Sequence, residues 1–147
     1  MERPDLTVDE KVGIFRLQNL MIDRPASFVE YVSGGCQINL SIAIDFTGSN
    51  GNPSSSNSLH YINSDKNQYI DAIKSVGEIL QYYDDDKKFC CYGYGASTMH
   101  CKVSHCFALN GNIFDPEIQG IDGVLDAYKH FLKNSTFSGP TNFEHVL

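Results

Sequence analysis

The stretch from Gln37 to Gly51, QINLSIAIDFTGSNG, constrains the fold of this chain more than any other part of it. Large apolar residues stand at every second position and are separated by smaller ones: Ile38, Leu40, Ile42 and Ile44. This period of two over a β-branched run is typical of a strand with one strongly apolar face. Small residues on the other face let a helix approach closely, so we expect a strand covered on both sides, as in an α/β sheet.

A loop of oxygen-bearing side chains follows this strand directly. Asp45, Thr47 and Ser49 form the pattern D-x-T-x-S, and turn-forming residues come next. In open α/β sheets ligands bind beyond the carboxyl ends of the strands, where this loop is expected. One carboxylate and two hydroxyls can converge on a small hard cation such as Mg²⁺. The same residue types also make turns and cap helices, and the spacing alone leaves both interpretations open.

The flanking segments predict an alternating order of strands and helices. Apolar residues at helical spacing predict amphipathic helices over 67–83 and 120–133. Aromatic or β-branched runs predict strands over 89–94 and 102–109, the second as an antiparallel edge strand. The strand, helix, strand order favours parallel pairing of the first two strands through a right-handed crossover.

Two short helical turns are expected outside this pattern. One covers residues 27–32, before the first strand. The other covers residues 142–147, and Thr141 directly before it is a candidate N-cap.

Length, charge and cysteine content limit the class of protein. A chain of 147 residues corresponds to one domain. The formal net charge of −7 argues against broad electrostatic capture of nucleic acid or of an anionic membrane surface. The N-terminal segment has no apolar signal core and no run is long enough to span a bilayer, so we expect a cytoplasmic protein. Its five cysteines are then expected to be reduced thiols.

No pattern in the sequence supports an enzymatic reaction. The cysteines and histidines between residues 90 and 106 include no C-x-x-C pair that could begin a zinc site. Gly93-x-Gly95 is half of a dinucleotide fingerprint, without the third glycine or a following helix. No nucleophile with its base and an oxyanion motif is visible. His60 is expected to be a packing residue and not a ligand, and the protein is expected to be non-enzymatic.

Six blocks occur in the order GGCQINLSIAIDFTGSNGNPSSSNSLHYI, VGEILQYYDDDKKF, CYGYG, VSHCFALNGN, GIDGVLDAY and GPTNF. Together they resemble the von Willebrand factor A-like domain of the copines. The resemblance implies a Rossmann-like open α/β sheet with helices on both faces, formed by residues 27–147. Residues 1–26 are expected to be an N-terminal tail or the end of a preceding lipid-binding β-sandwich, because residues 12–22 resemble the closing strand of that module.

The family likeness implies a metal-ion-dependent adhesion site made by three loops. Asp45, Thr47 and Ser49 match the first loop, and Thr141 in GPTNF matches the second. The expected ion is Mg²⁺ or Mn²⁺, with Ca²⁺ as an alternative, and binding is expected to be weak because the Asp of the third loop has no counterpart up to Leu147. We therefore expect an incomplete domain with an unpaired apolar sheet edge that is prone to self-association.

The resemblance also implies what such a domain does. It is expected to be a protein-interaction module of a calcium-dependent phospholipid-binding protein. Intracellular proteins would bind through an acidic residue that completes the metal site, and no nucleic acid is expected. A membrane would be reached through modules outside this chain, in a membrane-associated parent protein. The alternative is the copine-like domain of a RING-type ubiquitin ligase, which paired C-x-x-C ligands of a C-terminal RING would distinguish.

Overall fold

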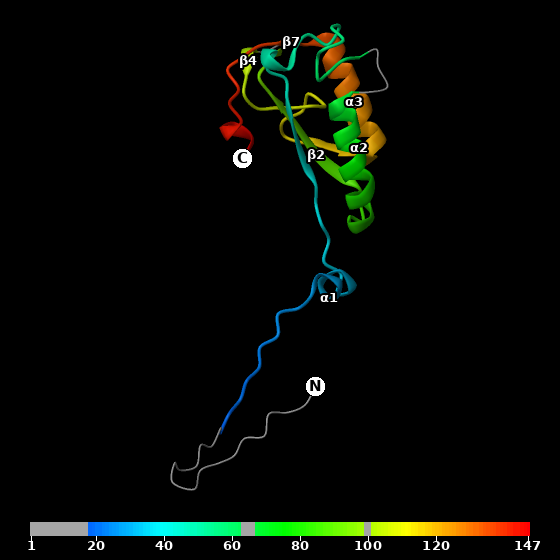
Figure 1. Ribbon diagram of the computed structural model, residues 1–147, viewed down its shortest axis with the longest axis vertical. Helices are drawn as coiled ribbons and strands as arrows, with labels where there is room; N and C mark the ends of the chain where they lie inside the picture. Colours follow the sequence, from blue (N-terminus) through cyan, green and yellow to red (C-terminus); the bar gives the residue numbers. More distant parts are fainter. Residues whose placement is uncertain (1–17, 63–66, 99–100) are drawn as a thin grey trace.

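A computed structural model of the chain describes residues 18–62, 67–98 and 101–147. A body of strands and two long helices follows an N-terminal segment that extends away from it (Figure 1). The helices are α1 (Phe28–Ser33), α2 (Gln68–Leu80) and α3 (Gly120–Asn134), with 3-10 turns η1 (Gly48–Asn50), η2 (Gln81–Tyr83) and η3 (Glu144–Val146). The strands are β1 (Ser41–Asp45), β2 (Lys88–Tyr94), β3 (Ala96–Thr98), β4 (Cys101–Ser104), β5 (Phe107–Ala108), β6 (Glu117–Gln119) and β7 (Thr136–Phe137). Among the described helices, none is both long and apolar enough to cross a lipid bilayer.

The N-terminal segment contains one short helix. α1 begins at the N-cap Ser27, which forms a capping box with Glu30, and the helix buries no residue. It is the helical turn predicted over 27–32. The strand-like run predicted over 12–22 lies mainly outside the described residues, and its described part, 18–22, is exposed and irregular. The division of the chain at residue 26 stays a prediction.

The main sheet is built around β2. β1 pairs with β2 in parallel, from Ser41 beside Cys90 to Asp45 beside Tyr94. β5 and β6 both pair antiparallel with β2 along its other edge. This arrangement confirms the predicted open α/β sheet with a parallel central pair. Within the described residues β1 is an edge strand, with β2 as its partner.

The segment predicted as one strand over 102–109 is divided between two sheets, so that prediction was wrong in its extent. β4 pairs with β3 in a second sheet, whereas β5 pairs with β2 in the main sheet. The Ser104 hydroxyl donates to the Cys106 carbonyl at 3.0 Å and closes a bend between the two parts. The pairing partners are distant in sequence, and the local apolar pattern carries no information about such a change of sheet.

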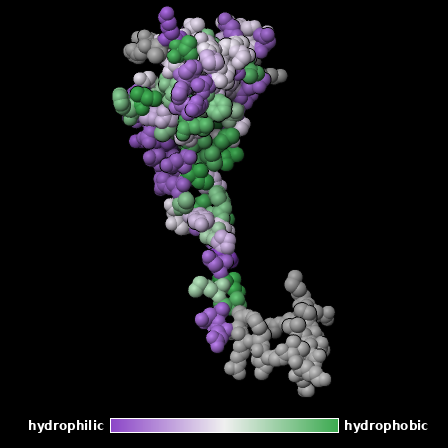
Figure 2. All heavy atoms as spheres, turned by 90° about the vertical axis from the view of Figure 1, so that its left-hand side faces the viewer, coloured by the Kyte–Doolittle hydropathy of each residue, from purple (hydrophilic) through white to green (hydrophobic). Residues whose placement is uncertain are grey.

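Both long helices lie on the same face of the main sheet (Figure 1). The residues that point toward them are buried: Ile44, Phe89 and Cys91. Ser41 and Ala43 on the other face are exposed. Figure 2 views the molecule from the side away from the helices and shows hydrophobic side chains beside a hydrophilic region there. We expected helices on both faces of the main sheet. In the described part of the chain, α2 and α3 cover one face.

The two helices approach each other closely because α2 presents a glycine to α3. An added Cβ on Gly77 would lie 2.2 Å from Cδ1 of Ile121 on α3, so a larger residue requires that side chain to move. Ile73 on the same face of α2 is buried, whereas Val76 is 50% exposed. The predicted helix over 67–83 is thus confirmed as α2 followed by η2. The buried face of α2 contains Gly77, and Val76 lies outside it.

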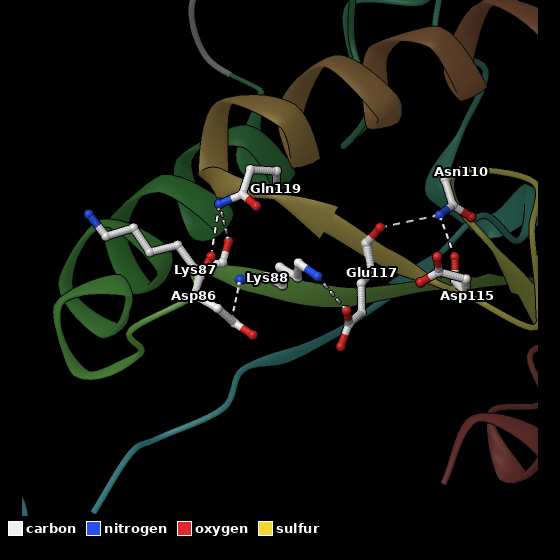
Figure 3. A network of polar contacts seen from close by, with 7 residues as sticks. All are labelled: Asp86, Lys87, Lys88, Asn110, Asp115, Glu117 and Gln119. Carbon is white, nitrogen blue, oxygen red and sulfur yellow. Dashed lines mark hydrogen bonds and ion pairs between the residues drawn. The ribbon is translucent and has the colours of Figure 1, made fainter. Parts of the chain in front are cut away.

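Polar contacts fix the end of β2 that is remote from the D-x-T-x-S loop (Figure 3). The side-chain amide of Gln119 donates to the Asp86 carbonyl at 2.9 Å. Lys88 and Glu117 form an ion pair at 3.6 Å between β2 and β6. Exposed pairs of this kind contribute about 1 kcal/mol or less, so their main role is to fix the register of β6.

Cys91 gives a pH-dependent test of this core. Its side chain is fully buried on β2, and burial raises the pKa of its thiol from 9.0 to about 12. The stability from the neutral thiol is complete below pH 9 and is lost as the pH rises toward 12. We expect Cys91→Ala to reduce the fall in the free energy of unfolding over this range, measured by urea denaturation. The same change at the exposed Cys36 should leave the fall unchanged, and equal behaviour of both variants would contradict the burial of Cys91.

Candidate functional site

The D-x-T-x-S loop turns immediately after β1. The Phe46 N–H donates to the Tyr94 carbonyl at 2.9 Å and continues the pairing one residue beyond the strand. The Thr47 N–H then donates to Oδ1 of Asp45 at 2.8 Å, and η1 begins at the next residue. This side-chain bond forms an Asx turn, which was one of the two interpretations of the sequence. It uses one oxygen of the Asp45 carboxylate.

Three hydroxyl groups come together beside this turn. Oγ1 of Thr47 lies 3.1 Å from Oγ of Ser49 and 3.1 Å from Oγ1 of Thr141. Thr47 and Thr141 are 94 residues apart in the sequence. The structure therefore gathers the three hydroxyl residues of the predicted set and joins Asp45 to them through the main chain of Thr47.

Main-chain bonds bring the second loop to the first. The Gly48 N–H donates to the Ser138 carbonyl at 2.6 Å, and Thr47 forms an isolated parallel bridge with Ser138. The Ser138 N–H donates to the Gly95 carbonyl at 2.9 Å, which ties the same residue to the end of β2. Three segments that are distant in the sequence thus meet at Ser138. Their spacing is set by peptide groups.

Thr141 is not the cap of the turn that follows it. The Glu144 N–H of η3 does not donate to the Thr141 hydroxyl but donates to Oδ1 of Asn142 at 3.1 Å. η3 is the short helical turn predicted over 142–147. Because Asn142 supplies the side-chain acceptor there, the Thr141 hydroxyl is available to the cluster and donates to Thr47.

His60 is tied to the site by contacts that sequence reasoning missed. It was expected to be a packing residue, and it is fully buried. In addition, its Nε2 lies 2.8 Å from the backbone carbonyl oxygen of Asp45, and its Nδ1 lies 2.7 Å from the Tyr128 hydroxyl. The sequence carries no signal for these bonds, because a single histidine has no periodicity and its partners are remote.

The negative charge of Asp45 shifts the pKa values of the titratable aromatic side chains around it. Burial first, and then the Asp45 charge, raise the pKa of Tyr69 to about 12. The same two causes raise the pKa of Tyr94. Burial lowers the pKa of His60, while the Asp45 carbonyl and carboxylate oppose that shift. At neutral pH both tyrosines are therefore uncharged and add no second negative charge beside Asp45.

The side chains of the cluster carry oxygen atoms, the ligand type that a small hard cation prefers. Mg²⁺ prefers oxygen ligands at about 2.1 Å in octahedral geometry, which puts adjacent ligands about 3 Å apart. The hydroxyl separations of 3.1 Å at Thr47 are close to that spacing. Within the described residues, no group of three or more His, Cys, Asp or Glu side chains is arranged to hold a metal ion. An ion bound at this cluster would rely on hydroxyls and one carboxylate.

Comparison with known proteins shows what the chain is similar to. A family model described as Copine matches residues 58–147. The chain is 48% identical over 123 residues to Protein BONZAI 2 of Arabidopsis thaliana. This similarity covers 82% of the chain and 21% of that protein, so the chain spans about a fifth of the length of this relative.

Proposed function

The chain belongs to the copine family, and from that premise we propose that it is a non-enzymatic module that recruits partner proteins through a divalent cation. The ion would be held by Asp45, Thr47, Ser49 and Thr141. One observation carries the proposal, which is the 3.1 Å separation between the hydroxyl oxygens of Thr47 and Thr141. Two loops that are distant in sequence present oxygen atoms to one point at the end of β1.

Each part of the proposed site has a separate role. Asp45 supplies negative charge through the carboxylate oxygen that Thr47 N–H does not occupy. The hydroxyls of Thr47, Ser49 and Thr141 supply neutral oxygen ligands from two loops. Mg²⁺ or Mn²⁺, or else Ca²⁺, would when bound supply positive charge that one carboxylate leaves partly uncompensated. A carboxylate of a partner protein is the natural further ligand for such an ion.

The charge of the chain supports a cation-dependent mode of recruitment. Its formal net charge of −7 repels an acidic partner, so a bound cation is needed to reverse the field locally. We propose intracellular proteins with an exposed Asp or Glu as the partners. Calcium-dependent contact with phospholipids would belong to other modules of a longer protein.

Asp45→Asn tests the metal site directly. We expect the variant to bind Mn²⁺ and Mg²⁺ at least about tenfold more weakly than the wild type, because a unit charge about 4 Å from an ion is worth about 1–4 kcal/mol per ionic charge. Isothermal titration measures both affinities. Asp126→Asn is the matched control, since it removes the same charge from an exposed position on α3. Equal heats for wild type and Asp45→Asn would remove the metal proposal.

The contribution of the second loop is tested by Thr141→Val. Valine keeps the branched shape of threonine and removes the hydroxyl that meets Thr47. We expect weaker Mn²⁺ binding with little change in the free energy of unfolding, because Thr141 is exposed. Wild-type affinity in this variant would show that the second loop supplies no ligand, even if Asp45 does.

A further inference from the structure

The peptide group that joins Asp45 to Phe46 is held from both sides. Its N–H donates to the Tyr94 carbonyl of β2 at 2.9 Å. In a trans peptide the N–H and C=O groups point in opposite directions. The Asp45 C=O therefore faces the edge of β1 that is unpaired within the described residues. There the carbonyl oxygen lies 2.8 Å from Nε2 of His60 and accepts a longer bond of 3.3 Å from the side-chain amide of Asn50.

Two aromatic rings lie parallel to the His60 ring and restrict its orientation. Tyr69 stacks on it, with ring centroids 3.9 Å apart and an interplanar angle of 11°. Phe46 lies parallel to the ring at 5.4 Å and 10°. The side chain is fully buried. A flip of the imidazole that exchanges the positions of Nδ1 and Nε2 would disturb the contacts with Tyr69 and Phe46.

The hydrogen-bond partners of His60 define the positions of its protons. A carbonyl oxygen only accepts, so Nε2 carries a proton and donates it to Asp45. In the neutral ring Nδ1 then accepts, and the Tyr128 hydroxyl donates to it at 2.7 Å. The contact of that hydroxyl with Oδ1 of Asn67 is longer, at 3.2 Å. Hydrogen bonds therefore run in one direction, from Tyr128 on α3 through His60 to Asp45 at the end of β1.

We infer that His60 is a positioning residue for the cation site. By holding the Asp45 carbonyl, it fixes the rotation of the 45–46 peptide and thereby the direction in which the Asp45 carboxylate leaves β1. That direction lets Oδ1 accept the N–H of Thr47, the residue whose hydroxyl lies beside that of Ser49 in the cluster. This inference rests on the proposed function for its effect on metal binding, but the positioning itself is a property of the metal-free protein.

Two amide substitutions separate the roles of the two His60 nitrogens. In His60→Gln the amide nitrogen reaches about as far as Nε2 and can still donate to the Asp45 carbonyl. In His60→Asn it reaches only about as far as Nδ1 and loses that bond. Both variants lose the same stacking contacts, so similar losses of stability are expected and each is the control for the other.

The expected result is a difference in metal affinity between these two variants. We expect His60→Asn to bind Mn²⁺ about tenfold more weakly than the wild type, as is usual for the loss of a group that orients a metal ligand. His60→Gln should stay close to the wild type. Isothermal titration with Mn²⁺ measures the affinities, and urea denaturation confirms that stability is matched. A merely structural role for His60 predicts the same affinity for both variants.

A second measurement needs no metal. Hydrogen exchange of the Thr47 amide, which is bonded to Oδ1 of Asp45, reports the orientation of the carboxylate in the metal-free protein. Exchange should be roughly fivefold faster in His60→Asn than in His60→Gln, because a hydrogen bond contributes about 1 kcal/mol. If the wild type binds no Mn²⁺, the proposed function fails and this measurement alone decides the positioning. Equal exchange in the two variants overturns it.

The wild-type protein supplies a further test if either variant fails to fold. The ¹⁵N chemical shifts of the His60 ring distinguish a protonated Nε2 from a protonated Nδ1. We expect the neutral ring with the proton on Nε2, because the Asp45 carbonyl can only accept. A ring protonated on Nδ1 alone cannot donate to Asp45, and this result would overturn the inference.

Discussion

Replacement of Phe46 by alanine is expected to lower the free energy of unfolding by about 3–5 kcal/mol. The Phe46 side chain is fully buried between the main sheet and α3. Its ring lies 4.5 to 6.1 Å, centroid to centroid, from five other rings: His60, Phe107, Tyr128, Phe131 and Phe137. Removal of the ring loses its transfer free energy and leaves a cavity that these surrounding rings cannot fill without leaving their own contacts.

Urea denaturation followed by circular dichroism measures this loss. Phe114→Ala is the matched control, because it deletes the same ring from a side chain that is 96% exposed. The control should change the free energy of unfolding by no more than about 0.5 kcal/mol. A similar cost for the two substitutions would show that Phe46 does not occupy the centre of the core.

Gly95→Ala is expected to lower the free energy of unfolding by about 2–5 kcal/mol, from two additive causes. The backbone of Gly95 has φ +78°, a left-handed conformation that costs about 1–2 kcal/mol for a residue with a Cβ. An added Cβ would also lie 2.2 Å from Cγ2 and 3.1 Å from the backbone nitrogen of Thr47. The clash costs about 1–3 kcal/mol more, because the Thr47 main chain is held by Asp45 and by the bridge to Ser138.

Gly111→Ala separates these two causes. Gly111 has nearly the same conformation, with φ +82°, but no atom lies within 4 Å of an added Cβ. Its substitution therefore carries the backbone cost alone. We expect Gly95→Ala to be the more destabilising variant by urea denaturation and to weaken Mn²⁺ binding, since Thr47 must move. Equal effects of the two substitutions on stability would contradict the close approach of Gly95 to Thr47.

The main features of the fold could be predicted because they leave periodic marks in the sequence. The alternation of Ile42 and Ile44 with smaller residues predicts β1, and the helical spacing over 120–133 predicts α3. The buried face of α2 was harder to predict. Apolar spacing favours Val76 as a core residue, but the close contact with α3 is made at Gly77, whose lack of a side chain has no apolar signature.

Part of the candidate site could likewise be predicted from the sequence, and part could not. The D-x-T-x-S pattern and the resemblance to the copines identified Asp45, Thr47, Ser49 and Thr141, and the structure brings the three hydroxyl groups of this set together. The residues that hold the site in place could not be predicted. Their bonds join segments that are remote in sequence, and single residues such as His60 give no repeating pattern.

Ser138 makes its bonds to the first loop and to the end of β2 with its own peptide groups. Peptide groups are the same in every residue, so exchange of the Thr47, Ser49 or Thr141 side chain leaves these main-chain bonds in place. Evolution or protein engineering can therefore vary the side chains of the hydroxyl cluster while the backbone framework that spaces them is inherited unchanged.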